Sequence, residues 1–342
     1  MSNRLKSGRL TLALTISLFG ALPAAAQDGP AYGAILEGFA YPHPVQHYRF
    51  TSQGQAMDMA YMDVKPASPN GHTVVLLHGK NFCAATWEGT IHALTGAGYR
   101  VIAPDQIGFC KSTKPAHYQY SFEQLASNTR ALLHAAGVTK AVIMGHSMGG
   151  MLATRYALTF PQETEMLVSL DALGLEDGRA KGVPWTGVDE AYRSSLKTTA
   201  DSIRAYEKSV YYGGEWKPEY DKWVEMQAGM FRGKDKELMA WNAALTSEMI
   251  YTQPVIHELE RLKMPVLFIV GDKDTTGKSN KVPPDVNATL GNFGAMGKAA
   301  VARVAHGQLI EFPDYGHSPQ IQAPEIFHKA LLGALEKTLP KL

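Results

Sequence analysis

A serine set between two glycines is the group in this sequence with the clearest chemical potential, in residues 145–149 (Gly-His-Ser-Met-Gly). The four apolar residues 141–144 before it predict a buried strand, and residues 151–158 after it predict a helix. A tight turn between strand and helix leaves no room for side chains beside the serine, so glycine is needed two positions before and two after. The pattern predicts that the Ser147 hydroxyl lies at the carboxyl edge of a sheet, above a helix N-terminus, where it could act as a nucleophile.

A serine hydroxyl is a poor nucleophile near neutral pH and needs a histidine base, which in turn needs an orienting acid. Two further predicted strands, residues 265–270 and 309–312, are each followed by polar residues able to fill these roles. Two acids, Asp272 and Asp274, follow the first of these strands. By residue type alone, four histidines compete for the role of base: His146, His257, His306 and His317.

Three motifs resemble those of the α/β-hydrolase superfamily, whose members hold a serine on a G-x-S-x-G nucleophile elbow. The elbow is the first, the G-x-x-D pattern of residues 271–274 is the second, and the Gly-His-Ser-Pro…Pro-Glu pattern of residues 316–325 is the third. The resemblance extends over residues 45–339.

The resemblance implies a chain order of serine, acid, histidine. It therefore assigns Ser147 as nucleophile, Asp274 as orienting acid and His317 as base. Asp272 is the runner-up for the acid. His146 lies within the elbow, and His306 precedes the last strand instead of following it.

The resemblance also implies an oxyanion hole made of two backbone N–H groups, from Lys80 and Met148. Lys80 follows a His-Gly pair at the end of the predicted strand 72–77. A lysine is unusual where the family has an apolar residue, so its side chain is expected to shape the pocket too. In the loop that begins at Asp105, Cys110 stands where the family pattern has its second glycine.

These assignments predict a serine hydrolase that cleaves a carboxylic ester, lactones included, through an acyl-enzyme on Ser147. An elbow serine in place of aspartate argues against dehalogenation and epoxide opening. Amidase, perhydrolase and carbon–carbon hydrolase activities on the same triad remain alternatives, as does a non-catalytic ligand-binding protein of the same fold. No cofactor is required and no metal site is predicted.

The order of predicted elements favours an α/β fold, a doubly wound and mostly parallel sheet. Residues 178–262 lack buried strands and carry many Trp and Tyr residues, which predicts a helical cap inserted into a core of residues 27–177 and 263–342. As a group the cap aromatics suggest a lid for an apolar or aromatic ester; singly, each is expected to pack the cap. The aromatics are Trp185, Tyr211, Tyr212, Trp216, Trp223 and Trp241.

The first residues of the chain predict export. Three basic residues precede an apolar run over residues 10–22 and a small-residue cleavage site at residues 24–26, as in a bacterial signal peptide spanning residues 1–26. We therefore expect a periplasmic or secreted protein without stable membrane insertion. The net charge of +1 over 342 residues gives no case for nucleic-acid binding.

The chain has two cysteines, Cys83 and Cys110. An even number of cysteines in an exported protein favours a disulfide. In the fold that the chain resembles, the two cysteines follow neighbouring parallel strands, so their loops leave the same edge of the sheet. We predict that they are bonded; two separate buried thiols are the alternative.

Overall fold

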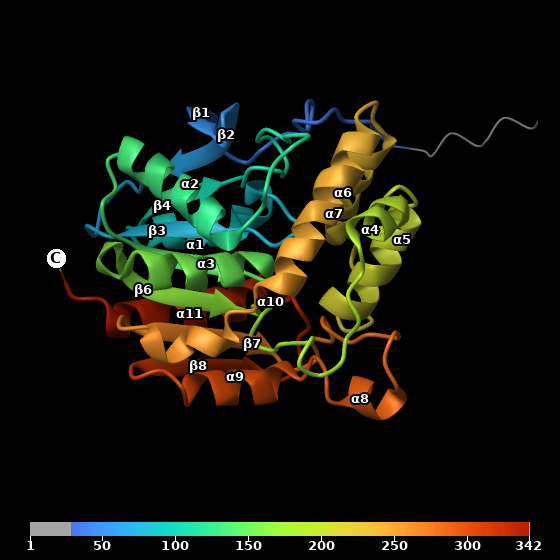
Figure 1. Ribbon diagram of the computed structural model, residues 1–342. Coiled ribbons are helices and arrows are strands. Elements are labelled where there is room, and N and C mark those ends of the chain that lie inside the picture. The colour runs from blue at the N-terminus through green and yellow to red at the C-terminus, as the bar shows by residue number, and fades with distance from the viewer. Residues whose placement is uncertain (1–28, 342) are drawn as a thin grey trace, which may run out of the picture.

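The computed structural model describes residues 29–341. The predicted signal peptide, residues 1–26, lies outside them. A sheet of eight strands with helices on both faces forms the centre of the molecule (Figure 1). The strands are β1 (Val45–Ser52), β2 (Gln55–Val64), β3 (Thr73–Leu77), β4 (Arg100–Pro104), β5 (Ala141–His146), β6 (Thr164–Leu170), β7 (Val266–Gly271) and β8 (Gly307–Phe312).

The strand order is β1-β2-β4-β3-β5-β6-β7-β8. The six strands β3 to β8 run parallel to one another. The β1–β2 hairpin joins them through β2, which pairs antiparallel with β4. The predicted mostly parallel α/β sheet is confirmed. Because all six parallel strands end at one edge, the loops that follow them meet there.

Alternate side chains of the parallel strands enter different cores. On β3, Val75 and Leu77 face one core, with α2 (Phe122–Ala135), α3 (Met148–Thr159) and α9 (Phe293–Val301). Val74 and Leu76 face the other, with α1 (Glu88–Gly96) and α11 (Pro324–Thr338). This is why residues 74–77 of β3 and residues 141–144 of β5 are all apolar: both faces of these strands are covered.

Between β6 and β7 the chain forms helices, and no strand occurs among residues 171–265. The predicted cap, residues 178–262, lies in this stretch, and Figure 1 shows its helices standing beside one end of the sheet. The α-helices are α4 (Val188–Ser195), α5 (Ala200–Tyr206), α6 (Asp221–Arg232) and α7 (Lys236–Thr252). Shorter turns are η3 (Glu207–Tyr211, a π-helix), η4 (Pro218–Tyr220) and η5 (Ile256–Arg261).

Residues 30–41, here called the N-terminal strap, join these helices to the core. The N–H of Ala34 donates to Asp235 Oδ2 beside α7 (2.9 Å), and that of Tyr32 to the Gly229 carbonyl on α6 (2.8 Å). Toward the core, the Tyr41 hydroxyl donates to Asp105 Oδ2 (2.6 Å).

Two short helices between β7 and β8, α8 (Pro284–Ala288) and α9, were not predicted. In residues 29–341, no helix is both long enough and apolar enough for a membrane span.

Candidate active site

The elbow has the geometry that its sequence predicts. β5 ends at His146, α3 begins at Met148, and Ser147 between them has φ 58°, a left-handed backbone that is strained for a non-glycine residue. A Cβ on Gly145 would overlap the Gly149 carbonyl, and one on Gly149 would overlap the Leu77 carbonyl of β3. Both glycines are therefore required for the backbone to pass through this corner.

His317 and Asp274 are in direct contact. Asp274 follows β7 and His317 follows β8, and the imidazole Nδ1 lies 2.5 Å from Asp274 Oδ2. Both side chains are completely buried. The other Asp274 oxygen accepts the N–H of Thr276 (2.7 Å), so the carboxylate is held at both ends.

Asp272 lies elsewhere. It is exposed on the surface near Glu311, and burial of part of the group, with the charge of Glu311, raises its pKa. The structure therefore places Asp274, and not the runner-up Asp272, against the imidazole.

The other ring nitrogen of His317 is unused. Nε2 is buried and has no hydrogen-bond partner among the described residues. The ring of His146, the residue before Ser147, lies 4.7 Å from the ring of His317, centre to centre, but no hydrogen bond joins the Ser147 hydroxyl to Nε2. The ring of Tyr211, from η3, also contacts the imidazole, with ring centres 4.8 Å apart. Contacts of this kind are often loose without substrate and tighten when it binds.

The three rival histidines are placed where they cannot act as the base. His146 Nε2–H donates to the His317 carbonyl (2.7 Å), and burial lowers its pKa well below the ordinary value, so it is a neutral positioning residue. His257 is exposed and pairs with Asp177, and His306 is exposed before β8.

The two backbone N–H groups predicted for the oxyanion hole are free to bond. Within the described chain, neither the Lys80 N–H nor the Met148 N–H has a protein acceptor. Met148 is the first residue of α3, so its N–H also lies at the positive end of the helix dipole. The Lys80 loop is fixed by His78, whose Nε2 accepts the Gln106 N–H (3.0 Å). His78 is not among the site residues predicted from the sequence.

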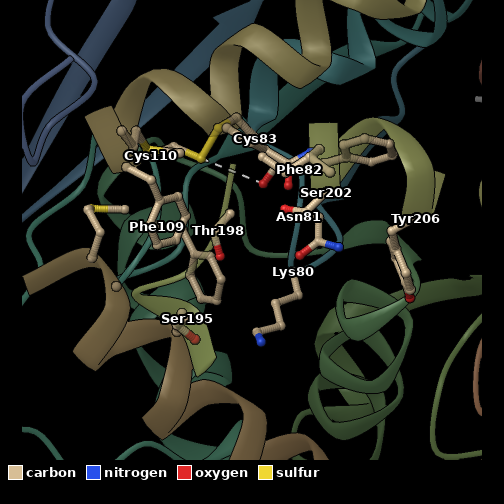
Figure 2. Close-up of a pocket in the computed structure, with 17 residues that line it drawn as sticks. Lys80, Asn81, Phe82, Cys83, Phe109, Cys110, Ser195, Thr198, Ser202 and Tyr206 are labelled. Atoms are coloured by element: carbon tan, nitrogen blue, oxygen red, sulfur yellow. Dashed lines mark hydrogen bonds between the residues drawn. A yellow bond between two sulfur atoms is a disulfide. The ribbon is translucent and has the colours of Figure 1, made fainter. Parts of the chain in front are cut away.

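A cavity of about 250 Å³ lies between the loops after β3 and β4 and the cap helices α5, α6 and α7 (Figure 2). Lys80 and Phe82 line its core side, and Tyr206 and Phe231 line its cap side. None of the six cap aromatics predicted as a lid lines this cavity. Tyr212 instead stacks on Tyr220, with ring centres 3.9 Å apart, inside the cap.

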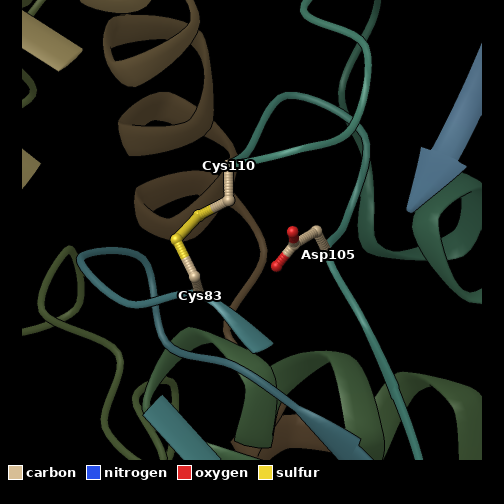
Figure 3. A group of neighbouring side chains, drawn as sticks. All are labelled: Cys83, Asp105 and Cys110. Carbon is tan, nitrogen blue, oxygen red and sulfur yellow. A yellow bond between two sulfur atoms is a disulfide. The ribbon is translucent and has the colours of Figure 1, made fainter. Parts of the chain in front are cut away.

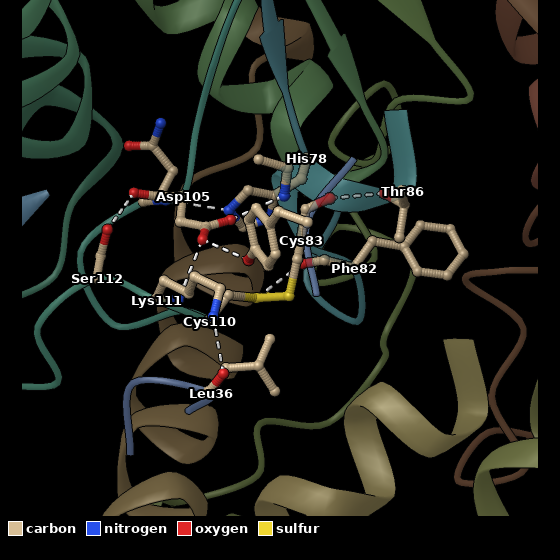
Figure 4. Close-up of a disulfide and its surroundings, with 12 residues drawn as sticks. Leu36, His78, Phe82, Cys83, Thr86, Asp105, Cys110, Lys111 and Ser112 are labelled. Carbon is tan, nitrogen blue, oxygen red and sulfur yellow. Dashed lines mark hydrogen bonds between the residues drawn. A yellow bond between two sulfur atoms is a disulfide. The ribbon is translucent and has the colours of Figure 1, made fainter. Parts of the chain in front are cut away.

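The predicted disulfide is present. Cys83 and Cys110 are bonded, with Cα atoms 5.8 Å apart, and the bridge joins the loops after β3 and β4 (Figure 4). Cys110 has φ 48°, which explains why glycine is usual there. Asp105 lies beside the two sulfurs (Figure 3). Both sulfurs are consumed by the bridge, and Asp105 accepts N–H groups from Ala84 and Lys111, so this cluster has no thiolate to offer a metal.

Asp171 is a buried acid that the sequence analysis missed. It follows β6, its Oδ1 accepts the Gly271 N–H (2.7 Å), and its Oδ2 has no partner among the described residues. Burial, reinforced by the charge of Asp274, raises its pKa well above the ordinary range. The sequence could have indicated Asp171, because an acid directly after a buried parallel strand lies at the same sheet edge as Asp274.

Comparison with known proteins gives consistent matches. The family described as "alpha/beta hydrolase fold" matches residues 72–324. A solved structure of a probable hydrolytic enzyme from Pseudomonas aeruginosa PAO1 is 58% identical, covers 90% of this chain and 99% of its own, and has a TM-score of 0.88. Lipase 1 from Psychrobacter immobilis is 28% identical over 74% of this chain and 73% of its own. A putative carbamate hydrolase, RutD, from Serratia proteamaculans (strain 568) is 25% identical over 79% and 93%.

Proposed function

The chain belongs to the alpha/beta hydrolase fold family, and we propose that it is a serine hydrolase that cleaves a carboxylic ester, lactones included. The observation that carries the proposal is the buried contact between His317 Nδ1 and Asp274 Oδ2, next to a serine held at φ 58° on the elbow. A surface histidine–aspartate pair would not need this burial, and a structural serine would not need the strained corner.

The reaction begins when the Ser147 hydroxyl attacks the carbonyl carbon and His317 Nε2 takes its proton. Asp274 keeps the Nδ1 proton in place and stabilises the imidazolium that forms. The N–H groups of Lys80 and Met148 donate to the tetrahedral oxyanion. His317 then protonates the leaving alcohol, and later activates the water that releases the acid from Ser147.

A fluorophosphonate probe tests this directly, because it labels only an activated serine. We expect labelling of the wild type at Ser147 and none of the Ser147→Ala variant. His317→Ala should lose labelling and, like Ser147→Ala, at least roughly 10⁴-fold in kcat toward esters, since triad residues act as a unit. Wild-type labelling of the His317→Ala variant would contradict the proposal, and unchanged circular dichroism would show that the fold is retained.

We further propose that the protein is exported, on the basis of residues 1–26 and of the disulfide, a bond that persists in oxidising compartments. Mass spectrometry of the protein from a periplasmic or culture fraction of a Gram-negative host should give a mature chain beginning at Gln27. Recovery of the full-length chain from the cytoplasm alone would contradict export.

A further inference from the structure

The cavity beneath the cap contains one cation and no acid to balance it. Lys80 extends from the core loop into the space between the two walls (Figure 2). Its ammonium donates one hydrogen bond, to Ser247 Oγ on α7 (2.5 Å). Of the described residues that line the cavity, only Lys80 and Tyr206 carry titratable side chains, and neither Asp nor Glu is among them.

The remaining ionisable neighbours do not supply a balancing charge at neutral pH. Burial raises the pKa of Tyr206 to about 12, so its hydroxyl is neutral. Glu207 lies behind the lining residue Gln227, which donates to its carboxylate, and burial raises the pKa of Glu207 to about 8. Burial also lowers the pKa of Lys80 to about 8, which leaves most of its ammonium charged at pH 7.

A desolvated ammonium without a counter-ion is costly, because its hydration is lost and no nearby charge replaces it. An ammonium has three N–H donors, and Ser247 uses one. The cavity is also lined by polar side chains that could hydrogen-bond to an anion: Asn81, Ser195, Thr198, Ser202 and Gln227. A single negative charge would neutralise the cavity, whereas a doubly charged phosphate would leave it negative.

The cavity is also adjacent to the reacting serine. Gly79 packs directly on Ser147, since a Cβ built on Gly79 would lie 3.2 Å from the Ser147 Cβ. Lys80 is the next residue, and its side chain lines the cavity. Ser147 does not itself line the cavity, so a substrate would have to extend past Gly79 to place its carbonyl at Ser147 and its far end at the ammonium.

We propose that this cavity is a carboxylate subsite, in which the Lys80 ammonium binds an anionic group on the acyl part of the substrate. The enzyme would then prefer hemiesters of short dicarboxylic acids, or lactones and esters that carry a carboxylate. This inference rests on the proposed serine-hydrolase function for its catalytic test, but not for its binding test.

The catalytic test compares two esters of matched shape. Monomethyl glutarate carries a terminal carboxylate, and methyl 5-methylhexanoate carries an uncharged isopropyl group in its place. We expect wild-type kcat/KM, followed by pH-stat at pH 7, to favour monomethyl glutarate at least tenfold. Lys80→Met keeps the backbone N–H and most of the side-chain volume, and should lower this ratio at least tenfold. Lys80→Arg should restore part of it, while Met239→Leu, a change in the same cavity without charge, should leave the ratio unaltered.

The binding test uses the Ser147→Ala variant, which separates the subsite from turnover. Isothermal titration with glutarate should show binding that the added Lys80→Met substitution weakens at least tenfold. Equal binding by both variants, or a wild-type preference for the uncharged ester, overturns the subsite. If fluorophosphonate labelling fails while glutarate binding depends on Lys80, the proposed hydrolase function is wrong and the subsite stands.

Discussion

At the scale of single residues, the site depends on which carboxyl reaches the imidazole. Asp274 is buried against His317 and Asp272 is exposed two residues away. We predict that Asp274→Asn lowers kcat by about 10⁴-fold, because an amide favours the wrong imidazole tautomer. Asp272→Asn, the matched control, should stay within about twofold. Ester kinetics on both variants decide the matter, and a larger loss for Asp272→Asn would transfer the role to it.

The buried Asp171 gives a prediction about stability. Its pKa is raised in the folded protein, so the folded state keeps a proton that the unfolded state loses above about pH 4. Stability contributed at this group therefore falls as pH rises above that value. Asp171→Asn removes the effect and keeps the acceptor for the Gly271 N–H. Relative to wild type, its free energy of unfolding should rise by up to about 1.4 kcal/mol per pH unit between pH 5 and 7.

Denaturant titrations of both proteins at pH 5, 6 and 7 measure this difference. A constant difference across the range would mean that Asp171 is already ionised in the folded protein, and would contradict the prediction.

At the scale of elements, the disulfide between the loops after β3 and β4 stabilises the fold, whereas the left-handed backbone at Cys110 destabilises it. Its 27-residue separation corresponds to roughly 3–4 kcal/mol of stabilisation in the chain-entropy treatment. The left-handed backbone of Cys110 costs about 1–2 kcal/mol in a residue with a Cβ. The bridge is therefore the larger effect, and it stabilises the loop that carries Lys80.

Two double variants separate these effects. Cys83→Ala with Cys110→Gly removes both the bridge and the strain, whereas Cys83→Ala with Cys110→Ala removes only the bridge. We predict that both are less stable than wild type, and that the glycine variant is the more stable of the two by about 1–2 kcal/mol. Urea unfolding of the three proteins measures the order, and equal stability of the two variants would show that position 110 is unstrained.

Elements with strong local signals were predictable, and those set by tertiary packing were not. The site could be located from the elbow glycines and from the positions of Asp274 and His317 after predicted strands. Such motifs are visible in the sequence because the backbone at these points tolerates few residue types. The cavity could not be anticipated, since its cap wall depends on how α5, α6 and α7 pack. The contact of Tyr211 with His317 likewise follows from cap packing and has no sequence signature.

At the scale of the whole molecule, we expect the space between cap and core to limit the size of the substrate. The cavity of about 250 Å³ is slightly below the ~300–1,000 Å³ of sites for drug-sized ligands. We predict that p-nitrophenyl acetate and butyrate are hydrolysed with kcat/KM at least tenfold above that of p-nitrophenyl palmitate. Phe231 lies on the cap wall, so Phe231→Ala should enlarge the cavity and reduce the difference in kcat/KM between the short esters and the palmitate. A preference for palmitate would contradict a small substrate site.

The N-terminal strap has a mechanical consequence. It binds α6 and the start of α7 at one end and Asp105 at the other, across 201 residues between Ala34 and Asp235. A hinge motion that lifted these helices away from the sheet would have to break the attachment of the strap at one end or the other. We therefore expect α6 and α7 to stay in place when substrate enters, and side chains such as Tyr211 to rotate instead. The strap can form its contacts with the helices only after about two hundred further residues have been synthesised, because its partners on α6 and beside α7 follow it by that distance in the chain.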